Sequence, residues 1–201
     1  MQTVPLPRPR MLRVFCLIAL TLAVSGSVSG QPAPDPTRLL AEAERMAWCK
    51  SWAKAEPLYA EAERLFAARG DERNALFARA GRMRGELPRR PVAQVSQELD
   101  DILALPLAQS DDRLRLRCLT IKGETEEDFD PELAEASWSE ALQIAERLGE
   151  KQWANWAKGE LGVVAALKGD MNAAIMQLGT ALAAAEASSD VPSLVRWLTI
   201  F

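Results

Sequence analysis

The residues of this chain best suited to chemistry are a group of arginines in its middle and six tryptophans along its length. A guanidinium group binds a carboxylate through two parallel hydrogen bonds, and indole rings are frequent anchors of protein interfaces. Together they predict a surface that receives an acidic or C-terminal carboxylate peptide. The candidate contact residues are Trp48, Arg79, Arg82, Arg113, Arg115, Arg117 and Trp156. Two alternatives stay open: acidic neighbours could pair the arginines on an ordinary solvated surface, and the tryptophans could belong to the core.

Catalytic and metal-binding patterns are absent from the sequence. The chain has no histidine, which removes the commonest general base and the usual metal ligand. It also has no phosphate-binding loop, no Gly-x-Ser-x-Gly turn and no zinc-type spacing. Asp128, Asp130 and Glu132 alternate like calcium ligands, but Leu133 stands where such a loop needs glycine. We therefore predict that the chain is not an enzyme and that it has no catalytic residue, cofactor or metal. Residues 123–129 are predicted to form an acidic connecting loop.

The first 30 residues have the pattern of a secretory signal peptide. Three arginines precede an apolar run at 14–24, and small residues follow at 25–30. The run is too short to span a bilayer, which needs about 20 residues; a short membrane anchor or a buried helix is the alternative. The pattern predicts an exported protein, periplasmic or secreted, with no integral membrane span after cleavage. The cleavage site and the true start, Met1 or Met11, stay open.

Charge points to a protein partner. Because residues 1–30 hold three of the 24 basic side chains and none of the 28 acidic ones, the remainder carries 21 basic and 28 acidic side chains, a net charge of −7. Surfaces that bind nucleic acids are basic. We therefore expect a protein or peptide partner and no nucleic acid.

Caps, prolines and apolar periodicity delimit the expected helices. After a short linker at 31–35, helices are expected at 36–49, 52–68, 73–85, 92–105, from 111 to the loop at 123, 130–148, and on both sides of a turn at 168–170 within 151–188. Pro57 either kinks the second helix or marks the start of a shorter one. Residues 113–118 alternate as a strand does, but we predict helix there because a single strand would have no partner.

A spacing of small and large residues recurs along the second helices. Its first positions are Ala55, Val95, Ala134 and Ala174, which follow one another by 40, 39 and 40 residues. Such a period is typical of a helical solenoid. The residues expected to pack the repeats are Ala55, Tyr59, Ala62, Val95, Leu99, Ala134, Trp138, Ala141, Leu161, Gly162, Ala174, Leu178 and Ala181. Across the last pair of helices, Leu161, Val164, Leu167, Ile175 and Leu178 are expected to interdigitate.

Leu161-Gly162, Gly169-Asp170, Ala174, Leu178 and Ala181 fall on the spacing of a tetratricopeptide repeat, and this stretch resembles one. The resemblance implies an all-α, right-handed superhelical solenoid of antiparallel helix pairs. It would comprise about four repeats over 36–189 and the truncated opening helix of a further repeat at 190–201. First helices would line a concave groove that holds the candidate contact residues.

The phase of the repeats bears on the cysteines that follow the leader. Cys49 and Cys118 fall in the first helices of the first and third repeats, too far apart for a disulfide. Both are predicted to be free thiols that are buried as small hydrophobic side chains.

The sequence thus predicts a non-catalytic scaffold for protein–protein interaction that binds a peptide or partner protein in its groove. The alternative is a structural or regulatory arm of a longer protein. Repeat regions behind a signal peptide resemble those of larger bacterial proteins, some with a caspase-like CHAT protease or a kinase module downstream. Such an effector domain would lie beyond residue 201.

Overall fold

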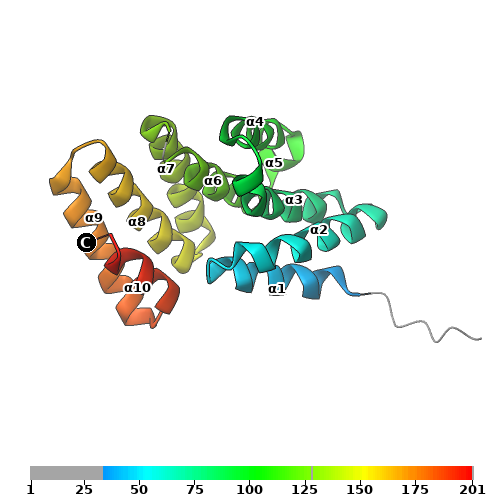
Figure 1. Ribbon diagram of the computed structural model, residues 1–201, viewed down its shortest axis with the longest axis horizontal. Coiled ribbons are helices and arrows are strands. Elements are labelled where there is room, and N and C mark those ends of the chain that lie inside the picture. The colour runs from blue at the N-terminus through cyan, green and yellow to red at the C-terminus, as the bar shows by residue number, and fades with distance from the viewer. Residues whose placement is uncertain (1–33, 128, 201) are drawn as a thin grey trace, which may run out of the picture. The chain divides into compact units, whose positions relative to one another are not determined.

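The computed structural model describes residues 34–127 and 129–200, and these residues are helical throughout apart from short turns (Figure 1). The predicted signal peptide, the first part of the linker and Cys16 lie outside the described residues. The helices are α1 (Pro36–Trp48), α2 (Trp52–Ala68), α3 (Glu72–Glu86), α4 (Val92–Leu103), α5 (Pro106–Ser110), α6 (Asp112–Glu126), α7 (Pro131–Leu148), α8 (Lys151–Leu167), α9 (Met171–Ser188) and α10 (Val191–Leu198), with a 3-10 turn, η1 (Leu87–Arg89), after α3.

Aspartate caps set most of the helix starts. The side chain of an aspartate accepts a hydrogen bond from a backbone N–H in the first turn of six helices, which stabilises an otherwise unpaired donor. These caps are Asp35, Asp71, Asp111, Asp130, Asp170 and Asp190. The prediction of a helix at 52–68 is confirmed, and α2 runs unbroken through Pro57.

Most helices pack against their neighbours in the chain. Close pairs are α1 with α2, α2 with α3, α6 with α7, α7 with α8, α8 with α9, and α9 with α10. The exception is α4, which makes few contacts with α3 and packs on α6 instead; α3 also packs on α6 (Figure 1). The middle of the chain therefore departs from simple pairing of consecutive helices.

The recurrent spacing has four positions in each second helix, and the first three are buried in all four helices. None of these twelve side chains is more than 3% exposed: Ala55, Tyr59, Ala62, Val95, Leu99, Ile102, Ala134, Trp138, Ala141, Ala174, Leu178 and Ala181. Gly162 is buried as well, and Leu161 is half-buried. The fourth position is buried only at Ile144; Leu65 is half-buried, and Leu105 and Ala184 are exposed. The constant interval thus corresponds to a constant pattern of burial at the first three positions alone.

Several expectations fail at particular places. The helical interpretation of 113–118 is confirmed, but the predicted acidic loop at 123–129 is wrong because α6 continues to Glu126. The helix expected at 92–105 ends at Leu103, and Pro106 opens the short helix α5, which the sequence did not predict. Val164 and Leu178 are buried as expected, whereas Leu167 and Ile175 are more than half exposed and do not interdigitate.

The close contact between α6 and α7 requires glycine at position 123, whereas Gly179 lies at no such contact. Substituting each of the two glycines therefore tests the packing. A Cβ atom at Gly123 in α6 would lie 2.6 Å from the indole ring of Trp138 in α7, whereas a Cβ at Gly179 in α9 would meet nothing within 4 Å. Gly123→Ala should lower the free energy of unfolding by about 1–3 kcal/mol through overpacking. Gly179→Ala should raise it by up to about 1 kcal/mol through helix propensity. Urea unfolding measures both, and equal effects of the two substitutions would contradict this packing.

Candidate functional site

A cavity of about 320 Å³ lies where the end of α1, the start of α2, α6 and α8 meet. Four of the six tryptophans line it: Trp48, Trp52, Trp153 and Trp156. The charged residues in its lining are Glu44, Arg45, Lys50, Arg117 and Glu124. Mostly apolar walls with a few polar groups are typical of ligand sites. We take this cavity as the candidate site and call it the tryptophan cavity.

Contacts between indole rings join the end of α1 to α8 at this cavity. The ring centroids of Trp48 and Trp153 are 5.0 Å apart in an edge-to-face arrangement, and those of Trp48 and Trp156 are 5.1 Å apart. The Trp48 indole N–H also donates to Asp190, the N-cap of α10, over 3.1 Å. Each aromatic pair contributes about 0.5–1.5 kcal/mol beyond the apolar area it buries. The end of α1 is therefore held against α8 and the start of α10.

Lys50 places its ammonium group between an indole face and a carboxylate. Its Nζ lies 4.2 Å from the Trp156 ring centroid and donates to Oε1 of Glu124 over 2.6 Å. The other oxygen of Glu124 accepts from Arg84 Nε over 2.7 Å. Burial alone would raise the pKa of Glu124, but the positive charges of Lys50 and Arg84 outweigh it and lower the pKa to about 2. Glu124 is thus ionised at neutral pH and bound to two cations.

Arg117 forms the opposite wall and is itself buried. Its Nη2 lies 2.8 Å from Oε1 of Glu44, and it also donates to the hydroxyl of Tyr59, which in turn donates to Glu44. Burial raises the pKa of the Tyr59 hydroxyl, so this group stays protonated as a donor. Only 3% of the Arg117 side chain is exposed. The charge of Arg117 is therefore paired within the protein, where it holds α1 and α2 to α6, and little of it is accessible to a partner.

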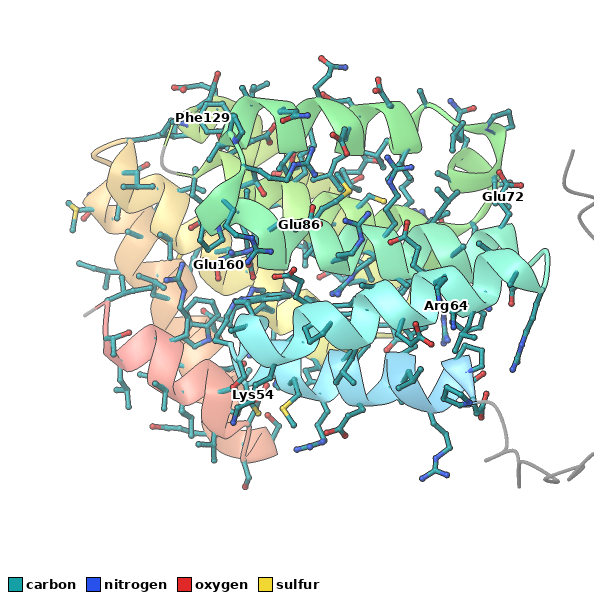
Figure 2. All side chains as sticks on the ribbon, turned by 45° about the vertical axis from the view of Figure 1, so that its right-hand side comes forward. Lys54, Arg64, Glu72, Glu86, Phe129 and Glu160 are labelled. Atoms are coloured by element: carbon teal, nitrogen blue, oxygen red, sulfur yellow. The ribbon has the colours of Figure 1, made fainter. Side chains whose placement is uncertain are left out.

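A second set of buried carboxyls lies beside the cavity, on α6 and α8. Figure 2 shows Glu160 among nitrogen and oxygen atoms in the interior, whereas Arg64 projects outward from α2. Arg196 of α10 donates to both Glu127, over 3.3 Å, and Glu160, over 2.8 Å. Burial and the negative charge of Glu160 raise the pKa of Glu127 well above its ordinary value. Glu127 therefore keeps its proton at neutral pH, and both carboxyls hold α10 through Arg196.

Glu126 is the third buried acid of this stretch. It accepts hydrogen bonds from Ser96 at 2.8 Å, Ser137 at 2.9 Å and Lys122 at 2.6 Å. These donors come from α4, α7 and α6, so one carboxylate ties three helices together. Glu124, Glu126 and Glu127, which fall in the predicted acidic loop, thus lie at helix contacts.

The candidate contact residues fall into two groups. Trp48, Arg117 and Trp156 line the tryptophan cavity, although only 1% of Trp156 is exposed. The other four arginines are each paired with a carboxylate of a neighbouring element. Arg79 pairs with Glu98, Arg82 with Glu63 and Glu86, Arg113 with Glu150 and Arg115 with Glu140. The structure does not bring the seven residues into one basic patch.

Two important site residues, Lys50 and Glu124, were missed by the sequence reasoning. Glu124 falls in the predicted acidic loop, and Lys50 lies between the first two predicted helices, where no role is predicted for it. A signal for Lys50 existed: the equivalent turns after α2, α7 and α8 have glycine at the position with positive φ, whereas the turn after α1 has lysine there. The predicted thiols of Cys49 and Cys118 are both free. Cys118 is buried as predicted, but Cys49 is exposed and lines the cavity because α1 ends before it.

Comparison with known proteins identifies no function for this site, so its function is inferred from the geometry described above. No protein family matches the chain, and no curated protein matches it either. None of the helices in the described ranges is both long and apolar enough to cross a bilayer. Within the same ranges, no three histidine, cysteine, aspartate or glutamate side chains are grouped to hold a metal ion.

Protonation of Glu127 gives a testable pH dependence. The unfolded chain releases this proton near pH 4.5, while the folded protein retains it. The free energy of unfolding should therefore fall as the pH rises above 4.5, by at most about 1.4 kcal/mol per pH unit. Glu127→Gln cannot ionise and should flatten this fall in urea unfolding measured from about pH 5 to 8. Exposed Glu132→Gln is the control, and a wild-type slope in Glu127→Gln would refute the protonation of Glu127 in the folded protein.

Proposed function

We propose that this protein is a non-catalytic scaffold for protein–protein interaction, with the tryptophan cavity as the place where a segment of its partner is held. The observation that carries the proposal is the cavity itself. Four indole rings and partly accessible charges of both signs surround about 320 Å³ of space, which exceeds what a few water molecules need. Aromatic walls with a few charged groups suit the side chain of a peptide better than they suit a solvated ion.

The proposed architecture is a tetratricopeptide-like, right-handed solenoid of about four helix pairs. Its support is the interval of 40, 39 and 40 residues between buried small positions in α2, α4, α7 and α9. In such an array the first helices, α1, α3, α6 and α8, share one face. Three of these four helices contribute to the cavity lining, as expected if the groove is the binding face. We also propose export, on the pattern of residues 1–30.

A second candidate function is favoured by the last helix. Val191, Val195 and Leu198 recur on one face of α10, and each is about 60% exposed. Apolar residues at this spacing are ordinarily covered by another element. As a structural or regulatory arm of a longer protein, the unit would pack this face against a following repeat, and an effector domain such as a CHAT-like protease or a kinase module would lie beyond residue 201.

The binding role can be tested through Cys49, the exposed thiol at the cavity. Peptides selected from a random display library against the purified protein should bind in fluorescence anisotropy. Alkylation of Cys49 with N-ethylmaleimide should then weaken them at least about tenfold, because the adduct fills part of the cavity. Buried Cys118 should not react in the folded protein, since burial also raises its pKa to about 12.

The control is Cys49→Ala, in which the same reagent should leave peptide binding unchanged. If the library yields no binders, or if alkylated wild-type protein binds them as well as before, the cavity is not the binding site. Silent alkylation would favour the second candidate, the structural arm.

A further inference from the structure

The turn between α1 and α2 contains an unusual choice of residue. Five turns in the described chain have the same pair of backbone hydrogen bonds, with a left-handed residue after the helix. Three of them use glycine, at Gly70, Gly149 and Gly169, and one uses Ser189. Lys50 has φ of 56° in the fifth, a conformation that residues with a Cβ adopt only at a cost. The lysine side chain must therefore contribute something that glycine would not.

The contribution is the position of its ammonium group. Nζ lies 2.6 Å from the carboxylate of Glu124 and 4.2 Å over the face of Trp156. A carboxylate that accepts an N–H and an aromatic face that meets the cation are the two elements by which proteins recognise ammonium groups. Glu124 and Trp156 thus form a site for an ammonium group, and the ammonium of Lys50 occupies it.

The exposure of its polar groups decides whether the cavity binds an ammonium group or a carboxylate. Trp156 Nε1 and Arg117 Nε have no hydrogen-bond acceptor among the described residues and could serve a ligand carboxylate, but neighbouring atoms cover both. The Lys50 side chain is 39% exposed and that of Glu124 is 11% exposed, so Lys50 can leave and a ligand can enter. When Lys50 leaves, Glu124 keeps its hydrogen bond from Arg84 and has one oxygen free. A ligand that takes the place of Lys50 at this oxygen must therefore supply an N–H donor, as a cation does.

We propose that the tryptophan cavity binds a primary ammonium group of the partner, as on a lysine side chain, which displaces Lys50 from Glu124 and Trp156. This inference rests on the proposed binding function and specifies its ligand. A primary ammonium is favoured over a quaternary one because Glu124 accepts a hydrogen bond that only an N–H can donate. Lys50 acts as an internal competitor, so the apparent affinity of the wild-type protein is reduced by the effective concentration of its own side chain.

The test compares Lys50→Gly with the wild-type full chain, using Nα-acetyl-lysine methylamide as the probe and isothermal titration with tryptophan fluorescence as readouts. Lys50→Gly vacates the site and places at residue 50 the amino acid that the turn favours. We expect it to bind the probe at least about tenfold more tightly than the wild type. The norleucine analogue, which lacks the ammonium, and acetate should not bind, and tetramethylammonium should bind more weakly than the lysine probe.

Two further variants complete the design. Adding Glu124→Gln to Lys50→Gly should abolish the gain, and Ser189→Gly, which relieves the same turn away from Glu124, should behave as the wild type does. If Lys50→Gly loses helicity, Lys50→Met removes the charge while keeping the aliphatic stem, and the same gain is expected. Equal affinity of Lys50→Gly and wild type for the probe, or equal binding of the norleucine analogue, would overturn the proposal. If this test fails but library peptides still lose affinity when Cys49 is alkylated, the proposed binding function stands and only the ammonium ligand is wrong. If the library peptides also show no such loss, both the ammonium site and the binding function are overturned.

Discussion

The contact between the end of α1 and α8 is the constraint on which the candidate site depends. It joins residues from opposite ends of the described chain, through the rings of Trp48 and Trp153 and through the bond from Trp48 to Asp190. Without this contact, the tryptophan cavity would have no wall on the side of α1. Lys50, which follows α1, would then not be held within hydrogen-bonding distance of Glu124. Local helix formation produces the elements, but this long-range contact produces the site.

Buried charges make the packing of the helices around the site specific, at a cost in free energy. Glu126, Glu160 and Arg117 are each at most 3% exposed, and desolvation of such groups is tolerable only when partners are in place. Each of them joins different helices: Glu126 holds α4 and α7 to α6, Glu160 holds α10 to α8, and Arg117 holds α1 to α6. Removal of one partner from a buried pair costs about 3–5 kcal/mol. A misplaced helix would leave such a charge unpaired, so these groups disfavour alternative packings.

Sequence reasoning recovered the parts of the fold that local chemistry determines. Asp130 with Pro131 at the start and Gly149 at the end delimit α7 without reference to any other helix. The recurrence of Ala55, Ala134 and Ala174 likewise predicts burial, because small residues permit close approach of two helices. The existence of the helices and much of the core were therefore accessible from the sequence.

The site was not accessible in the same way. Periodicity treats Glu124, Glu126 and Glu127 as surface or loop residues, since nothing nearby in the chain shows that Lys50, Ser96 and Arg196 will neutralise them. Ile175 was expected in the core because its spacing on α9 is helical, yet α8 covers only part of that face. Whether an apolar or a charged residue is buried depends on partners far away in sequence, and one sequence does not specify them.

Nuclear Overhauser measurements on the tryptophan indole protons test the central contact most directly. Single substitutions such as Trp48→Phe and Trp153→Phe would assign the six indole signals. Because the ring centroids of Trp48 are 5.0 Å from Trp153 and 5.1 Å from Trp156, the account predicts cross-peaks from Trp48 to both rings. Cross-peaks from Trp48 to α1 and α2 alone, with none to either ring of α8, would contradict it.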